Sequence, residues 1–219
     1  MAGRGDEYAR LAALYDPATA RALGPLRRLV ASLASSRAPG RALDVCCGTG
    51  RQCALFAGAG FEATGLDLSP AMLARAAVLP GAGRFVQGDA ARLPFGGGLF
   101  AVTSVTLALH EKSPELRPLI LSEMIRVTAP GGLLLVADYA AARGLPGLAQ
   151  SFGVGLVERL AGREHHAFYR HFMAQGGLEG LLGGVGLRPA AVIRRFAGLM
   201  GVAVIERDRA TGFAPAALR

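Results

Sequence analysis

The stretch Leu43-Asp44-Val45-Cys46-Cys47-Gly48-Thr49-Gly50 decides the fold of this chain. It has the pattern of a buried strand that ends in a glycine-rich turn, and the residues after it favour a helix. Because such a turn carries few side chains, a ligand can lie against its backbone N–H groups. A second acid, Asp67, ends the next strand in Gly65-Leu66-Asp67-Leu68. The two features predict a nucleoside-bearing cofactor on an α/β sheet.

Strands and helices alternate along the chain around this turn. Three of the strands are almost continuous apolar runs, as strands buried on both faces of a parallel sheet are. The alternation predicts an α/β fold with a Rossmann-like, doubly wound and mostly parallel sheet. The expected strands are 41–46, 62–67, 83–87, 99–107 and 133–137, and the helices among them are 50–58, 69–77 and 114–128.

The last two strands should run antiparallel. Residues 190–196 and 202–206 have strand character, and the link between them is too short for a crossover helix. They should therefore form a hairpin, which completes a seven-stranded sheet.

Two regions lie outside the alternation, within what should be one domain, residues 1–219. Residues 1–36 predict N-terminal helices, separated at Asp16-Pro17, that form a lid over the site. Residues 140–187 predict a helical substrate cap inserted after strand five. This cap is glycine-rich and helical in pieces, at 147–160, 164–173 and 177–182.

The composition limits the classes of partner. The net charge is +8, but only Lys112 is a lysine and the arginines are scattered, with 6% aromatic residues and no Trp. A nucleic-acid surface needs clustered charge with aromatic residues between, so this pattern argues against nucleic acid. No signal peptide and no apolar run of about eighteen residues is apparent, so we expect no membrane insertion and a cytoplasmic protein.

The three cysteines, Cys46, Cys47 and Cys53, all lie around the glycine turn. Their odd number and the lack of a second cluster favour small packing side chains over a disulfide or zinc role. The pair His165-His166 would need a third ligand that the sequence does not identify. The sequence therefore predicts no metal site.

A dinucleotide is the alternative cofactor. Gly48-x-Gly50-x-x-Cys53 approximates the dinucleotide fingerprint, and Asp67 follows at a suitable distance. However, Asp44 would repel a pyrophosphate, whereas it could accept hydrogen bonds from a cationic amine. Asp89 follows strand three, where it can accept from an adenine amino group. The terminal hairpin also differs from the usual dinucleotide fold.

With these motifs in order, the chain resembles the class I S-adenosylmethionine-dependent methyltransferases over nearly its whole length. Residues 44–50 match the acid-x-Gly-x-Gly-x-Gly motif of that family with Cys46 at the first glycine, and Ala101 stands where the family usually has Asp. The chain is most similar to the ubiquinone/menaquinone-biosynthesis-type branch, also called methyltransferase domain 11-like. The further motifs that carry the resemblance are 65–73, 88–95, 100–110, 123–132, 168–172 and 198–203.

The resemblance implies S-adenosyl-L-methionine as cofactor and a small-molecule methyl acceptor, quinone-like or apolar. It places Asp44 at the methionine amino group, Asp67 at the ribose hydroxyls and Asp89 at the adenine amino group. The other implied cofactor contacts are Cys46, Gly48, Thr49 and Gly50 in the turn, Leu68, Met72 and Ala90 at the adenine, and Thr106 and Leu107 at the sulfonium end.

Methyl transfer is an in-line displacement on an activated methyl group, so the protein mainly aligns and desolvates the reactants. A general base is needed only where the nucleophile carries a proton of high pKa. An oxidoreductase that uses NAD(P) and a non-catalytic binding protein remain alternatives. The candidate bases and substrate contacts are His110, Tyr139, His166 and Tyr169, with His165 and His171 beside them, and Tyr15 either covers the cofactor or packs in the core.

Overall fold

Apolar runs form the central strands of the sheet, where both faces are covered. The computed structural model describes residues 12–141 and 163–208, with side chains from Leu23 onward. Seven strands hydrogen-bond in the order β3-β2-β1-β4-β5-β7-β6. They are β1 (Arg41–Val45), β2 (Glu62–Asp67), β3 (Arg84–Gln87), β4 (Phe100–Thr106), β5 (Thr128–Tyr139), β6 (Ala191–Arg195) and β7 (Met200–Glu206).

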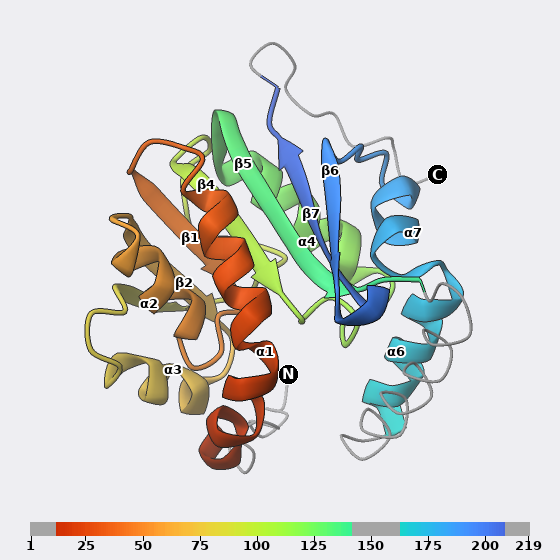
Figure 1. Ribbon diagram of the computed structural model, residues 1–219, viewed down its shortest axis with the longest axis horizontal. Helices are drawn as coiled ribbons and strands as arrows, with labels where there is room; N and C mark the ends of the chain where they lie inside the picture. Colours follow the sequence, from red (N-terminus) through yellow and green to blue (C-terminus); the bar gives the residue numbers. More distant parts are fainter. Residues whose placement is uncertain (1–11, 142–162, 209–219) are drawn as a thin grey trace.

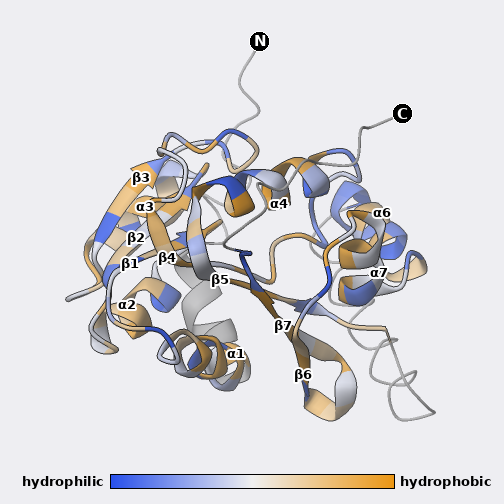
Figure 2. Cartoon of the chain, turned by 90° about the horizontal axis from the view of Figure 1, so that it is seen from above, coloured by the Kyte–Doolittle hydropathy of each residue, from blue (hydrophilic) through white to orange (hydrophobic). Residues whose placement is uncertain are grey.

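Helices cover both faces of this sheet (Figure 1). Helices α1 and α2 lie against one face and α4 against the other, which Figure 2 shows from above. Helix α3 begins at Pro70 because the Ser69 hydroxyl accepts a hydrogen bond from Met72 N at 3.2 Å. The helices are α1 (Ala12–Ala34), α2 (Arg51–Gly58), α3 (Pro70–Ala77), α4 (Leu116–Val127), α6 (Arg163–Ala174) and α7 (Gly177–Gly184), with a short 3-10 turn at Phe196–Gly198.

The topology confirms the predicted fold. Strands β1 to β5 pair in parallel, while β7 pairs antiparallel with both β5 and β6. The carboxyl ends of the parallel strands therefore meet at one edge of the sheet, where ligands of such folds bind. Among the described residues, no helix combines the length and the apolar character that are needed to cross a bilayer.

Two local predictions were wrong. Helix α1 runs through Asp16-Pro17 without ending, because a proline removes one helical hydrogen bond and can bend a helix without terminating it. Strand β5 starts at Thr128, directly after α4, rather than at Leu133. The sequence Pro130-Gly131-Gly132, which favours a turn between helix and strand, instead lies at an irregularity in the β4–β5 ladder and is held by hydrogen bonds of 2.8 and 2.9 Å to Arg207.

The insertion after β5 is helical where the structure describes it. Helices α6 and α7 match two of the three expected helical pieces to within one or two residues. The third, 147–160, lies outside the described residues. Helix α7 packs closely on β5, since a Cβ at Gly177 would lie 2.8 Å from the Tyr139 carbonyl oxygen.

Candidate functional site

The glycine turn after β1 is tight and left-handed. Cys46, Gly48 and Gly50 have φ angles of 56°, 53° and 77°. Gly50 has no room for a side chain, because a Cβ there would lie 2.7 Å from the Phe85 ring. Cys46 carries a Cβ in a conformation that costs L-residues about 1 kcal/mol. The turn therefore bends as its motif requires, even though its first glycine is replaced.

Asp67 ties this turn to the start of α3. Its Oδ2 accepts from Gly48 N at 2.8 Å and its Oδ1 from Ser69 N at 2.9 Å. A carboxylate has about four acceptor positions, so these two bonds leave capacity on both oxygens. The half-buried Asp67 can thus fix the turn and still accept from two hydroxyl groups of a ligand.

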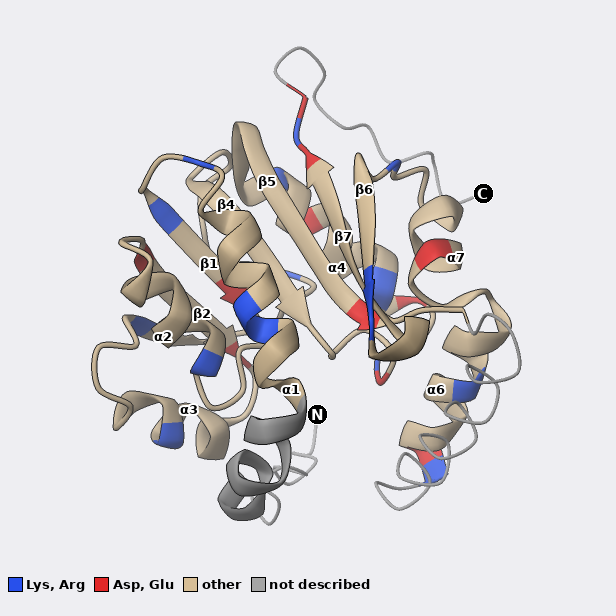
Figure 3. Cartoon of the chain, viewed as in Figure 1, with Lys and Arg blue, Asp and Glu red and all other residues tan. Residues whose placement is uncertain are grey.

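Asp44 lies deeper, near the carboxyl end of β1. Its side chain is buried, and the Ser104 hydroxyl donates to its Oδ1 at 2.6 Å. Burial raises the pKa of Asp44 to about 7, against the opposing effects of that hydrogen bond and of the Arg27 charge. A ligand cation beside Asp44 would reverse this shift, because it favours the ionised form. Figure 3 shows acidic positions near the carboxyl ends of β1, β2 and β5.

The residues expected around an adenine ring lie at the neighbouring strand ends. Leu68 is 69% exposed although it is apolar, so its side chain is available to a ligand. Met72 and Ala90 are buried, and Met72 belongs to the buried face of α3. Asp89 is exposed and accepts from Ala91 N at 2.8 Å, which shapes the loop after β3.

Two buried polar side chains near the turn have no hydrogen-bond partner among the described residues. They are the hydroxyl of Thr106, at the end of β4, and the amide of Gln52, in the first turn of α2. Leaving such groups unsatisfied costs about 1–3 kcal/mol each. Next to Thr106, Leu107 takes a left-handed φ of 53°. These strained and unsatisfied groups are consistent with a site that a polar ligand completes.

The cysteines pack behind the turn. A Cβ on Gly65 would lie 2.7 Å from Cys47 Sγ and 2.9 Å from Cys53 Sγ, so both thiols fill the space that this glycine leaves. A hydrogen bond to Cys53 and burial raise the pKa of Cys47, which keeps its thiol protonated.

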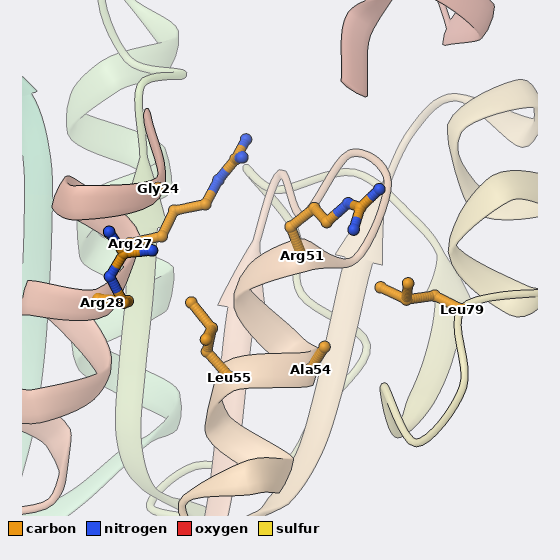
Figure 4. A pocket seen from close by; sticks show the side chains of 7 residues that line it. All are labelled: Gly24, Arg27, Arg28, Arg51, Ala54, Leu55 and Leu79. Carbon is orange, nitrogen blue, oxygen red and sulfur yellow. The ribbon is translucent and has the colours of Figure 1, made fainter. Parts of the chain in front are cut away.

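A pocket of about 220 Å³ opens between α1 and α2. Figure 4 shows the long side chains of Arg27, from α1, and Arg51, from the start of α2, at its wall. The sequence did not indicate Arg27 and Arg51 as site residues, because arginines are scattered along the whole chain. The pocket is lined by Gly24, Arg27, Arg28, Arg51, Ala54, Leu55 and Leu79.

Beyond β4 and β5, the aromatic candidates come together. The His110 ring centroid lies 4.8 Å from that of Tyr139 and 6.2 Å from that of Tyr169. Tyr139 and Tyr169 are 5.3 Å apart. All three side chains are buried. Three of the four predicted catalytic candidates thus form one cluster between the sheet and α6.

Asp138 organises this cluster, and sequence reasoning missed it. The His110 Nδ1 lies 2.7 Å from Asp138 Oδ1, and Asp138 is fully buried. Its oxygens also accept from the backbone N–H groups of Leu109, His110 and Tyr139 at 2.8 to 3.2 Å. An acid at the carboxyl end of the apolar run 133–137 was the signal that could have revealed it.

Arg117 connects the cluster to the cap. This buried side chain of α4 donates to Leu109 O at 3.0 Å and to Phe168 O at 2.7 Å. Its guanidinium also lies 3.2 Å from His171 Nδ1 and 5.1 Å from the centre of the Phe172 ring. Helix α6 is therefore attached to the end of β4 through one arginine.

The two histidines at the start of α6 differ in their surroundings. His165 lies beside His110, with ring centroids 5.9 Å apart, and its Nδ1 is 3.7 Å from Glu111 Oε2. His166 is half-buried on the same helix. Among the described residues it is not part of the cluster of possible metal ligands that His110, Glu111 and His165 form. The role predicted for His166 stays a prediction. Tyr15 falls in the part of α1 whose side chains are not described.

Comparison with known proteins finds methyltransferases among the similar sequences. Residues 42–132 match the family described as methyltransferase domain. A demethylmenaquinone methyltransferase of Beutenbergia cavernae is 36% identical over 64% of this chain and 58% of its own length. A malonyl-[acyl-carrier protein] O-methyltransferase of Serratia marcescens is 32% identical over 61% of this chain and 51% of its own. The matches span about half the length of such relatives.

Solved structures share the fold. An O-methyltransferase family protein from Burkholderia thailandensis superposes with a TM-score of 0.69 at 20% identity, covering 92% of this chain and 61% of that one. A protein from Pyrococcus horikoshii gives 0.63 at 18% identity over 88% and 91% of the two chains. Residues 42–132 of the chain are therefore similar to methyltransferase domains, on a Rossmann-like fold that the solved structures share, with sequence relatives among the demethylmenaquinone methyltransferases.

Proposed function

We propose that this protein transfers the methyl group of S-adenosylmethionine to a small-molecule acceptor. The observation that carries the proposal is the pair of carboxylates at the glycine turn, Asp44 and Asp67. A buried acid directly under the turn disfavours a pyrophosphate and suits an ammonium group. Asp67 keeps acceptor capacity for the two hydroxyls of a ribose.

The residues around the turn suit the other parts of this cofactor. The exposed face of Leu68 would cover the adenine ring, and Asp89 would accept from its amino group. Arg27 and Arg51 provide positive charge near the end where the amino acid's carboxylate would lie. The Thr106 hydroxyl would gain a polar partner at the sulfonium end. When bound, the cofactor supplies an already activated methyl group.

The chain's own task is then to orient the acceptor and take its proton. Asp138 holds His110 through Nδ1, and since a carboxylate only accepts, that nitrogen carries the proton. The Nε2 of a neutral His110 can therefore receive a proton from an acceptor hydroxyl. Tyr139, Tyr169 and Phe172 exclude water around it. His110 thus takes the role of general base.

The acceptor is, in this proposal, apolar or quinone-like. The side chains that cluster beyond the ends of β4 and β5 are aromatic rings, which suit a flat ring better than a charged chain. Sequence relatives that methylate a demethylmenaquinone support this class, whereas those named for malonyl-acyl carrier protein point to a carboxylate acceptor.

Calorimetric titration with S-adenosylmethionine and with its demethylated product tests the cofactor, and NADH is the parallel control. Binding of both sulfur compounds with no heat from NADH is the expected result. Binding of NADH alone would replace the proposal with a nicotinamide-dependent reaction. A screen of hydroquinones, phenols and fatty carboxylic acids for methylation tests the acceptor. Binding without turnover on any of them would favour a non-catalytic binding protein.

A further inference from the structure

Three side chains with metal-ligating atoms meet beside the aromatic cluster. His110 and Glu111 follow β4, and His165 lies in the first turn of α6. One ligand atom from each lies within 4.8 Å of the other two. Two imidazoles and one carboxylate are a ligand set of catalytic zinc and non-haem iron sites, which keep positions open for water or substrate. The fold brings them together from segments more than fifty residues apart.

We propose that His110, Glu111 and His165 bind a divalent transition-metal ion, with Zn²⁺ as the reference case. The hydrogen-bond partner of His110 supports this metal site. A histidine that ligates a metal through one nitrogen usually donates its other N–H to a carboxylate, which fixes the tautomer and raises its basicity. Asp138 Oδ1 is that carboxylate, 2.7 Å from His110 Nδ1. The lone pair of His110 is thereby directed to Nε2.

Asp138 also makes this ligand rigid. It is fully buried and accepts from three backbone N–H groups, so it cannot turn away from the imidazole. A site with one immobile ligand loses less entropy when the other two close on an ion.

The other two ligands have to move a short way. Ligands about 2.1 Å from one tetrahedral ion lie about 3.4 Å from each other, so the longest separation, up to 4.8 Å, must shorten by up to about 1.4 Å. The side chains of Glu111 and His165 are 14% and 21% exposed and can rotate toward the fixed His110. Glu111 has its Oε1 on Lys112 Nζ at 2.9 Å, which leaves Oε2 on the side of His165.

Lys112 sets a limit on the affinity. Its charge near Glu111 repels an incoming cation, so binding should be weaker than at a structural zinc site with four ligands. A weakly held ion with open positions suits exchange with a substrate atom better than a structural role. With the ion bound, His110 Nε2 would be a ligand and no longer a base. The ion would instead polarise an oxygen or sulfur of the acceptor and lower the pKa of its proton, which would then pass to water. This role rests on the proposed function, whereas the binding of the ion does not.

The test uses the full chain without a tag, stripped with a chelator. Titration with Zn²⁺ should show one ion per chain, and Glu111→Gln and His165→Ala should each weaken it at least tenfold. His166→Ala is the matched control, because it removes the next histidine of the same helix and should leave the affinity unchanged. Co²⁺ should give visible d–d bands without a thiolate charge-transfer band.

Three outcomes would overturn the proposal. They are no uptake of Zn²⁺, equal affinity in His165→Ala and wild type, or a thiolate band that places the ion at Cys46, Cys47 or Cys53. Circular dichroism of each variant separates loss of a ligand from loss of the fold. Titration of the stripped protein with S-adenosylmethionine tests the proposed function separately, so the two can fail independently.

Discussion

The carboxyl edge of the sheet has a cofactor half, around the glycine turn after β1, and an acceptor half, around His110 and Asp138. The two halves are held together in different ways. On the cofactor side, Asp67 bonds backbone N–H groups 19 and 2 residues away. On the acceptor side, side chains bond across 28 to 54 residues, through His110–Asp138 and Arg117–His171. The glycine turn of the cofactor half is thus fixed by local bonds, although Asp44 beneath it accepts from Ser104, 60 residues along the chain. The acceptor half exists only once β4, β5, α4 and α6 have assembled.

This difference predicts that binding and turnover can be damaged separately. The largest effect should come from Asp138→Asn, which keeps the shape of the side chain but disrupts the hold on His110. General acid–base catalysis typically contributes about 10²–10⁴-fold, and we expect a loss of that size in kcat. The affinity for S-adenosylmethionine should stay the same. Steady-state turnover on an acceptor from the screen, with calorimetry on the same protein, measures both.

Glu179→Gln is the control for that variant. Glu179 is an acid of α7 that pairs with Arg194 and lies outside the aromatic cluster. It should leave kcat unchanged. Wild-type turnover in Asp138→Asn would mean that the His110–Asp138 pair is purely structural and that the acceptor needs no base.

The converse variant, Asp67→Ala, should damage the cofactor half. It removes both backbone bonds to Gly48 and Ser69 and the contacts proposed for the ribose. At about 1.5–3 kcal/mol for a hydrogen bond to a charged group, the affinity for S-adenosylmethionine should fall about 100-fold. Glu62→Ala, at the opposite end of the same strand, is exposed and 3.6 Å from Arg41, and should change nothing. Equal affinities in the two variants would contradict the assignment of Asp67.

The same difference explains what could be predicted from the sequence. The glycine turn, Asp67 and the Ser69 cap could be predicted because local backbone geometry demands those residue types at those positions. The mostly parallel sheet and its terminal antiparallel hairpin followed from apolar runs and connection lengths. The irregularity at Pro130-Gly131-Gly132 could not be predicted, because it depends on bonds to Arg207, far along the chain.

The acceptor half shows where sequence patterns fail. The sequence indicated His110, Tyr139 and Tyr169 as separate candidates, but not that Asp138 holds one of them. Asp138 reads as an ordinary acid near a strand end until its burial is known. Similarly, neighbouring His165 and His166 cannot be told apart without the rotation of α6, which the contact with Arg117 fixes.

Helix α4 carries one arginine on each side, so the contributions of the two halves to the stability of the protein can be compared. Arg117 donates to Leu109 O and Phe168 O on the acceptor side, and Arg126 donates to Phe95 O and Leu93 O on the other. Arg117 is buried and Arg126 is 41% exposed.

Methionine keeps the apolar stem of an arginine but removes its donors. We expect Arg117→Met to lower the free energy of unfolding by about 2 kcal/mol, since it leaves buried carbonyls unsatisfied, and Arg126→Met by about 1 kcal/mol or less, since water replaces its bonds. Urea denaturation of both variants measures this. Equal losses would show that the two halves depend on α4 to the same degree.

The smallest effect concerns pH and Asp44. With its pKa raised to about 7, this carboxyl must lose a proton before it can bind an ammonium group, so the affinity for S-adenosylmethionine should fall up to tenfold per pH unit below 7 and level off above. The folded state holds this proton between about pH 4 and 7 while the unfolded chain releases it, so stability falls as pH rises through that range.

Asp44→Asn keeps an oxygen for the Ser104 hydroxyl and removes the titration. It should bind S-adenosylmethionine weakly, with no dependence on pH around 7, and should be more stable than wild type at pH 8. Calorimetry and thermal unfolding at pH 6, 7 and 8 compare the two proteins. A variant that is both less stable at pH 8 and unchanged in affinity would show that Asp44 supports the sheet. The buried charge would then belong to the fold, and the cofactor half would rest on Asp67 alone.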